Sequence, residues 1–181
     1  MGRFSDAWRW IAKHDASGRC LRSEIVANLE GCDGLPPQTV VPMLAYRDGP
    51  AALDWLASAF GFVERSRFID EQGRLAHGEM VASGGLIMLA TPTPDYEGPS
   101  LHRSNCQSAD KWLSVPWVVD GVLVYVDDVA AHCERARRAG ARLLSEVETG
   151  PPGTRYRVED IEGHRWMFME RPPAEAGEGA A

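Results

Sequence analysis

An internal repeat limits what this chain can fold into more than any other feature of its sequence. The segment Leu44-Ala-Tyr-Arg-Asp48 is similar to Leu123-Val-Tyr-Val-Asp127, which lies 79 residues later, and the same offset brings Gly61 onto Gly140. In each half an apolar segment ends at an aspartate, a helix-like segment follows, and a glycine ends it, as glycine commonly does at the left-handed position after a helix. We therefore expect two copies of one supersecondary unit.

The segment after each aspartate has the signals of a helix start. Asp48 and Asp127 can accept hydrogen bonds from the free N–H groups of a first helical turn. Pro50 suits that turn, where its missing N–H is not needed. The second helix is expected at about 129–139. The first has an apolar stripe at helical spacing, formed by Leu53, Leu56 and Phe60.

Three strand-like segments follow each helix, separated by turns rich in Gly, Asp and Pro. Each half therefore has the order βαβββ, which gives an α+β fold. The expected strands are 63–69, 74–81 and 86–90 in the first half, and 141–147, 154–159 and 165–170 in the second.

The chain is expected to hold one domain, at 39–170, with module one at 39–95, a connector at 96–118 and module two at 119–170. The connector has a possible short helix at 108–113. Residues 1–38 form an extension with a short amphipathic helix, since Phe4, Trp8 and Ile11 recur at roughly helical spacing. The tail at 171–181 lacks core-forming residues and is expected to be flexible.

Composition and charge narrow the classes of partner that this protein can bind. With 44% apolar and 25% charged residues, the 181-residue chain is ordinary for a soluble globular protein. Its formal net charge of −7 disfavours nucleic acid and anionic membranes as partners and tolerates cationic ligands. No apolar run approaches the length of a membrane span.

The cysteine pattern points to a reducing cytoplasm. Four cysteines stand at 20, 32, 106 and 133 without any CxxC pair, so neither a zinc ribbon nor a redox motif is present. Cys133 falls inside the second expected helix and is interpreted as a buried thiol.

Two βαβββ halves resemble the vicinal oxygen chelate superfamily, which includes glyoxalase I, bleomycin-resistance proteins, extradiol dioxygenases and fosfomycin-resistance enzymes. Three strings are similar to that group: Ala52-Leu-Asp-Trp-Leu-Ala-Ser-Ala-Phe-Gly-Phe62, Gly73-Arg-Leu-Ala-His-Gly-Glu79 and Val158-Glu-Asp-Ile-Glu-Gly-His-Arg-Trp166. The likeness covers about 39–170 and implies a curved mixed sheet around a central pocket. Because one fold hosts many chemistries, the resemblance says less about function than about fold.

The resemblance also implies where metal ligands would stand. In metal-dependent members, His or Gln on the first strand and Glu on the last strand of each module bind the ion. Those four positions hold Val41, Met88, Gly121 and Met167 here, none of which is an ordinary ligand for such ions. A slip of one residue adds only Asp120, so we expect no metal cofactor.

Strand side chains alternate between faces, so residues two positions away share the face of those four. The inferred pocket is apolar and rich in methionine, which suits loosely specified aromatic ligands; alternatively, these residues fill the space and leave no cavity. The neighbours on that face are Met43, Ala45, Ala90, Leu123, Tyr125 and Met169. The opposite face, expected beneath the helices, holds Leu44, Tyr46, Val124, Trp166 and Phe168.

His77 and Glu79 form the most informative polar pair, because they share one strand face. They could bind a polar ligand group or act as an acid–base couple, or they could be an exposed strand pair. His164 is interpreted as a turn residue bonded to nearby backbone, and His132 as a surface residue of the second helix. Trp112 in the connector could belong to a lid or to the packing.

Two function classes follow. The first is a protein like the bleomycin-resistance branch, a homodimer that binds an aromatic or cationic small molecule in a metal-free pocket. The alternative is a lyase or dioxygenase-type enzyme of the same superfamily, metal-dependent or using His77 and Glu79 as its acid–base pair. No catalytic residue is assigned. The candidate ligand-binding residues are Met43, His77, Glu79, Met88, Tyr125 and Met167.

Overall fold

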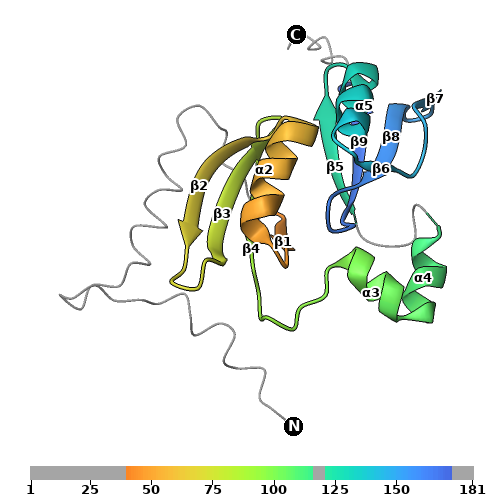
Figure 1. Ribbon diagram of the computed structural model, residues 1–181. Helices are drawn as coiled ribbons and strands as arrows, with labels where there is room; N and C mark the ends of the chain where they lie inside the picture. Colours follow the sequence, from red (N-terminus) through yellow and green to blue (C-terminus); the bar gives the residue numbers. More distant parts are fainter. Residues whose placement is uncertain (1–39, 116–120, 173–181) are drawn as a thin grey trace. The chain divides into compact units, whose positions relative to one another are not determined.

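The computed structural model describes residues 40–115 and 121–172. The expected helix around Phe4, Trp8 and Ile11 lies outside these ranges, as do Trp117 and most of the tail. Within them the chain forms two βαβββ modules joined by a helical connector (Figure 1). The predicted α+β class and the repeated order of elements are confirmed.

Module one forms a mixed four-stranded sheet in the order β1-β4-β3-β2. Helix α2 carries the chain from β1 to β2, at the opposite edge of the sheet. The β2–β3 and β3–β4 pairs are antiparallel, and β4 then pairs in parallel with β1. The elements are β1 (Met43–Ala45), α2 (Gly49–Phe60), β2 (Val63–Ile69), β3 (Leu75–Ala82) and β4 (Gly85–Ala90).

Module two repeats this plan in a second mixed sheet with the order β5-β9-β8-β6, and β7 also pairs with β8. The strand expected at 141–147 is interrupted, because the N–H groups of Leu144 and Ser145 both donate to the carbonyl of Arg157. The elements are β5 (Gly121–Val126), α5 (Val129–Arg138), β6 (Arg142–Leu143), β7 (Glu148–Gly150), β8 (Gly153–Glu159) and β9 (Arg165–Glu170).

The connector contains two helices, α3 (Pro99–Asn105) and α4 (Gln107–Leu113). The second matches the expected segment at 108–113. The first was not predicted: it begins at Pro99 after Gly98 and has no buried residue, so it lacks the apolar stripe by which a helix is recognised in sequence.

The helix starts differ from the sequence prediction in one respect. Asp48 caps α2 by accepting from the N–H of Ala51 at 3.1 Å, as expected. Helix α5 is capped by Asp128, which accepts from the N–H of Ala131 at 2.8 Å, and not by Asp127. Each of these aspartates accepts from the N–H three residues later, so the capping residues repeat at an offset of 80 residues in place of 79.

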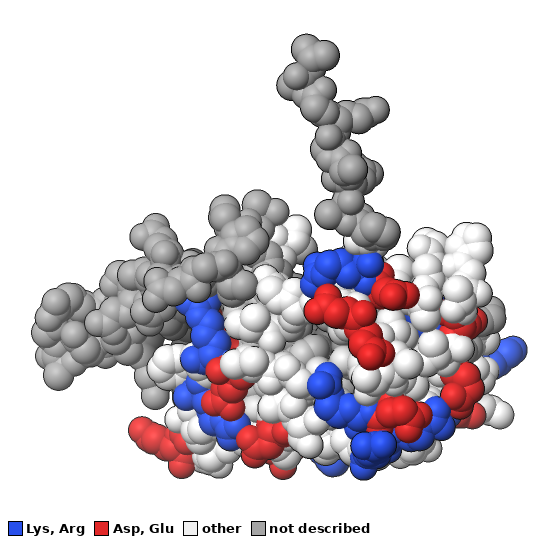
Figure 2. All heavy atoms as spheres, turned by 90° about the horizontal axis from the view of Figure 1, so that it is seen from above, with Lys and Arg blue, Asp and Glu red and all other residues white. Residues whose placement is uncertain are grey.

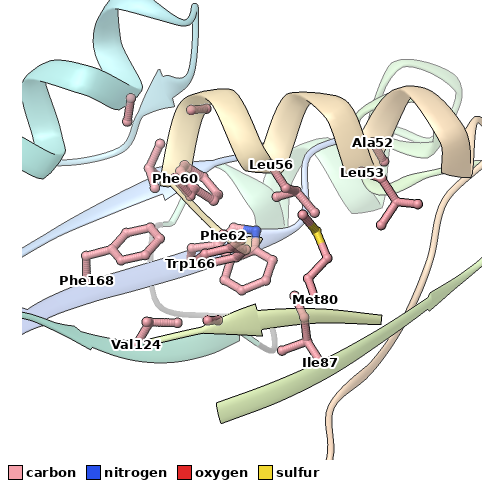
Figure 3. Packing of buried hydrophobic residues seen from close by; sticks show 14 of the residues in the cluster. Ala52, Leu53, Leu56, Phe60, Phe62, Met80, Ile87, Val124, Trp166 and Phe168 are labelled. Carbon is pink, nitrogen blue, oxygen red and sulfur yellow. The ribbon is translucent and has the colours of Figure 1, made fainter. Parts of the chain in front are cut away.

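One core serves both modules, because α2 and α5 contact each other and cover their sheets. The predicted stripe of α2 is fully buried, and aromatic rings of both modules meet beneath it (Figure 3). The face expected beneath the helices is also confirmed: Tyr46, Val124, Trp166 and Phe168 are buried, and Leu44 packs against them.

Candidate functional site

The helix-free face of the first sheet brings four of the six candidate residues together. Cross-strand pairing places Glu79 beside Met88, and Met88 beside Met43, in one row across β3, β4 and β1. His77 lies two residues before Glu79 on the same face of β3. Met43 is 67% exposed, so the β1 end of this row is open to a partner or a ligand.

Glu79 is the unusual member of that row, because this acid is only 7% exposed. Its Oε1 lies 3.1 Å from Nε2 of His77, and its Oε2 lies 3.7 Å from Nε of Arg65. A buried carboxylate needs such partners to remain charged. His77 and Glu79 therefore form a preformed polar site on an otherwise apolar face. This site can hold a cationic group or exchange a proton.

The other two candidates lie on the second sheet. Leu123 pairs with Met167 and Tyr125 pairs with Met169 across β5 and β9, and Leu123 and Tyr125 are 42% and 38% exposed. On β8, Arg155 and Arg157 flank this face. Both guanidinium groups are bound to the single carboxylate of Glu148, at 3.1 and 2.9 Å, so their positive charge is only partly neutralised.

Two cavities lie away from the open row on the first sheet. One, of about 190 Å³, lies between the β3–β4 hairpin and β5, and Tyr125 is among its lining residues. The larger, of about 430 Å³, lies between the connector helices and the turn before β9, and includes Trp112. The sequence did not predict this cavity, because α3 was not recognised. The aromatic residues of the connector were the signal that could have indicated it.

The turn before β9 joins the modules. Asp160 accepts four hydrogen bonds, from the Tyr46 hydroxyl at 2.6 Å, the Trp166 indole at 2.9 Å and two N–H groups of its own turn at 3.0 Å. Glu162 accepts the N–H groups of Arg47 and Asp48 at 2.8 Å, at the start of α2. Burial raises the pKa of Asp160, while His164 and these donors act in the opposite sense.

His164 has a structural role in the same turn. Its Nε2–H donates to the carbonyl of Ala45, in module one, at 2.8 Å. The interpretation of a turn residue bonded to backbone is therefore correct, but the backbone belongs to the other module.

His132, expected at the surface, is instead only 5% exposed. Its Nε2–H donates to the carbonyl of Phe60 at 3.0 Å, and its Nδ1 accepts from the Tyr156 hydroxyl at 2.7 Å. The contact between α2 and α5 covers it, which a helix seen alone cannot show. Burial, together with the nearby Arg135, lowers the pKa of His132 to about 4.

The positions implied for metal ligands are occupied by Val41, Met88, Gly121 and Met167, as aligned from sequence. Across 40–115 and 121–172, no three His, Cys, Asp or Glu side chains converge as a metal site requires. These residues do not fit a metal ion of the kind that imidazole and carboxylate ligands hold.

The described surface is mixed in charge. Figure 2 shows acidic and basic side chains interspersed on one face, without a continuous basic patch on that face. Within the described ranges, none of the helices combines the length and apolarity needed to span a bilayer.

Known proteins similar to this chain share its fold. An uncharacterized protein of Mycobacterium bovis is 29% identical over 129 residues, which is 70% of this chain and 79% of that protein. The crystal structure of TioX from Micromonospora sp. ML1 is 30% identical and covers 76% of this chain and 98% of its own, with a TM-score of 0.54. That of UcmS2, at 18% identity, covers 74% and 99% with a TM-score of 0.51, and shows the fold alone.

The family comparison extends over the whole two-module region. The model of the "Glyoxalase/Bleomycin resistance protein/Dioxygenase superfamily" matches residues 38–168, which include both modules and the connector. This chain belongs to the glyoxalase/bleomycin resistance protein/dioxygenase superfamily.

Proposed function

We propose that this protein binds a small aromatic or cationic molecule on the helix-free faces of its sheets, without a metal and as a homodimer. The observation that carries the proposal is the row of Met43, Met88 and Glu79, with His77 beside it. Thioether side chains adapt to flat apolar ligands. The Glu79 carboxylate, already partly desolvated, provides a counter-charge for a cationic group.

The dimer is proposed because apolar side chains are exposed on both sheets. Met43, Phe68, Leu123 and Tyr125 are 67%, 53%, 42% and 38% exposed, and exposed apolar side chains that gather in a patch mark a binding surface. A second copy laid against these faces would convert open surfaces into an enclosed site lined by Met43, His77, Glu79, Met88, Tyr125 and Met167.

Light scattering and ligand titration test the two parts separately. We expect a dimer at micromolar concentration, and saturable binding of an aromatic cation that weakens at least tenfold in Glu79→Gln. Glu146→Gln is the matched control, since its carboxylate is exposed and lies on the segment between β6 and β7. A stable monomer would refute the dimer, and equal affinity of the Glu79 and Glu146 variants would refute the site.

Elemental analysis tests the metal-free part of the proposal. We expect less than stoichiometric zinc, iron, manganese or nickel in the purified protein. One tightly bound ion per chain, lost on changing strand residues, would contradict it.

A second candidate is an enzyme of the same superfamily that uses His77 and Glu79 as an acid–base pair. The observation that favours it is the 3.1 Å contact between the imidazole and the carboxylate on a face open to ligand. In that case His77→Gln would abolish turnover while leaving binding almost unchanged. A simple binding protein would show no turnover in either form.

A further inference from the structure

The cavity of about 430 Å³ beside the connector has the size of a small-molecule site and is separate from the sheet faces. Its walls come from the segment before α3, from α3 and α4, and from the turn that joins the modules. None of the six candidate residues of the sheets lines it. The function proposed for the sheet faces therefore does not account for this cavity.

Aromatic rings form much of its lining. Trp112 of α4 is 60% exposed although it lies at the cavity, while Leu113 beside it is buried. Tyr96, His102 and His164 bring three further rings. An exposed indole above an apolar hollow is a surface on which a flat ring can stack.

Two polar groups of the lining are fixed by one carbonyl. Tyr96 donates its hydroxyl proton to the carbonyl of Ala45 at 3.0 Å, and His164 donates Nε2–H to the same oxygen at 2.8 Å. The Tyr96 oxygen therefore remains as an acceptor at the wall.

Apart from its buried Nε–H, the cationic group at the cavity is already engaged. The guanidinium of Arg165 donates to the carbonyls of Leu113 and Val115 and to the carboxylate of Glu159, and the side chain is only 4% exposed. The accessible ionised group is Glu97, whose side chain is 38% exposed. It contacts Asn105 Nδ2 at 2.8 Å and His102 Nδ1 at 3.3 Å, which hold it at the rim.

We propose that this connector cavity is a second binding site, for a planar aromatic cation that stacks on Trp112 and is held by the Glu97 carboxylate. A cation above an indole face is attracted by the negative face of the ring. A carboxylate that is still 38% exposed beside an aromatic wall favours positive over neutral rings. The site does not depend on the sheet faces, so it stands apart from the function proposed above.

The test compares two probes of the same shape, N-methylacridinium and acridine, at a mildly alkaline pH where acridine is uncharged. Fluorescence titration of the full chain is expected to show N-methylacridinium binding about tenfold tighter. Glu97→Gln should remove most of this preference and leave acridine affinity unchanged. Trp112→Ala should weaken both probes about tenfold, and Trp112→Phe, which keeps a ring, should weaken them less.

Two controls separate this site from the sheet faces and from folding. Glu146→Gln should leave the affinity for N-methylacridinium unchanged, and Tyr125→Ala should remove only the binding that the sheet faces contribute. Thermal unfolding checks that each variant is folded. Loss of all binding in Tyr125→Ala, with none in Trp112→Ala, would overturn the connector site while supporting the sheet-face proposal. Equal affinity for both probes, or no binding of either, would also overturn it.

Discussion

At the scale of single residues, His132 of α5 uses both ring nitrogens, Nε2 to the carbonyl of Phe60 in α2 and Nδ1 to the hydroxyl of Tyr156 in β8. The ring also lies 4.0 Å from that of Phe168, measured between centroids. Its hydrogen bonds are satisfied by the neutral tautomer with the proton on Nε2, since a carbonyl can only accept. A charged imidazole there would be buried beside Arg135, which explains why its pKa is lowered.

This environment predicts a pH dependence of stability. Between the unfolded pKa of 6.5 and the folded value of about 4, only the unfolded chain binds the proton, so the free energy of unfolding rises with pH. His132 thus stabilises fully above about pH 6.5, and its contribution falls by at most about 3 kcal/mol as pH approaches 4.

Urea unfolding at several pH values measures this effect as the difference between the wild type and His132→Gln. Subtracting the two curves removes the contributions of other groups, including Asp160. His102→Gln is the control, because that side chain is 57% exposed. A difference curve that does not change between pH 4 and 7 would contradict the assignment.

At the scale of elements, helix α5 shows that the position of a capping residue is fixed to a single residue. Two aspartates follow β5, and either could cap by composition. Asp128 receives the N–H of Ala131, whereas the Asp127 carboxylate is 92% exposed and lies 3.5 Å from Nε of Arg171. Only the first satisfies an otherwise free donor of the helix.

We therefore expect Asp128→Ala to lower the free energy of unfolding by about 1 kcal/mol, the usual cost of losing a cap. Asp127→Ala should change it by less than about 0.5 kcal/mol, as for an exposed surface group. Chemical denaturation of the two variants side by side decides between them. The reverse order would restore Asp127 as the cap.

At the scale of the whole molecule, the described modules are joined by polar contacts as well as by the shared core. Asp160 and Glu162, in one turn of module two, accept hydrogen bonds from Tyr46, Arg47 and Asp48 of module one. Because these groups are satisfied only when both modules are docked, we expect the modules to unfold together.

Asp160→Ala tests this coupling. It leaves the Tyr46 hydroxyl, the Trp166 indole and two backbone N–H groups without their acceptor, so a loss of about 3–5 kcal/mol is expected. Asp160→Asn keeps one acceptor oxygen and should lose less. Both variants should still unfold in one transition, followed by circular dichroism and tryptophan fluorescence. Two separate transitions in the wild type would show that the modules are independent.

Much of the fold was determined by the sequence alone, because its signals are local. The stripe of Leu53, Leu56 and Phe60, the cap at Asp48 and the three strands after each helix depend on neighbours a few residues away. The alternation of strand side chains also predicted that Met43 and Met88 share a face and that His77 and Glu79 share one, whereas only the structure shows that these are the same face. The repeat then required two modules.

Other features were decided only by tertiary structure, because they depend on which distant surfaces meet. The burial of His132 follows from the contact of α5 with α2, and that of Glu79 from its place among neighbouring strands. The cavity at Trp112 exists because α3 and α4 lie against the turn before β9. Burial and cavity shape are set by long-range packing, which a periodic pattern does not encode.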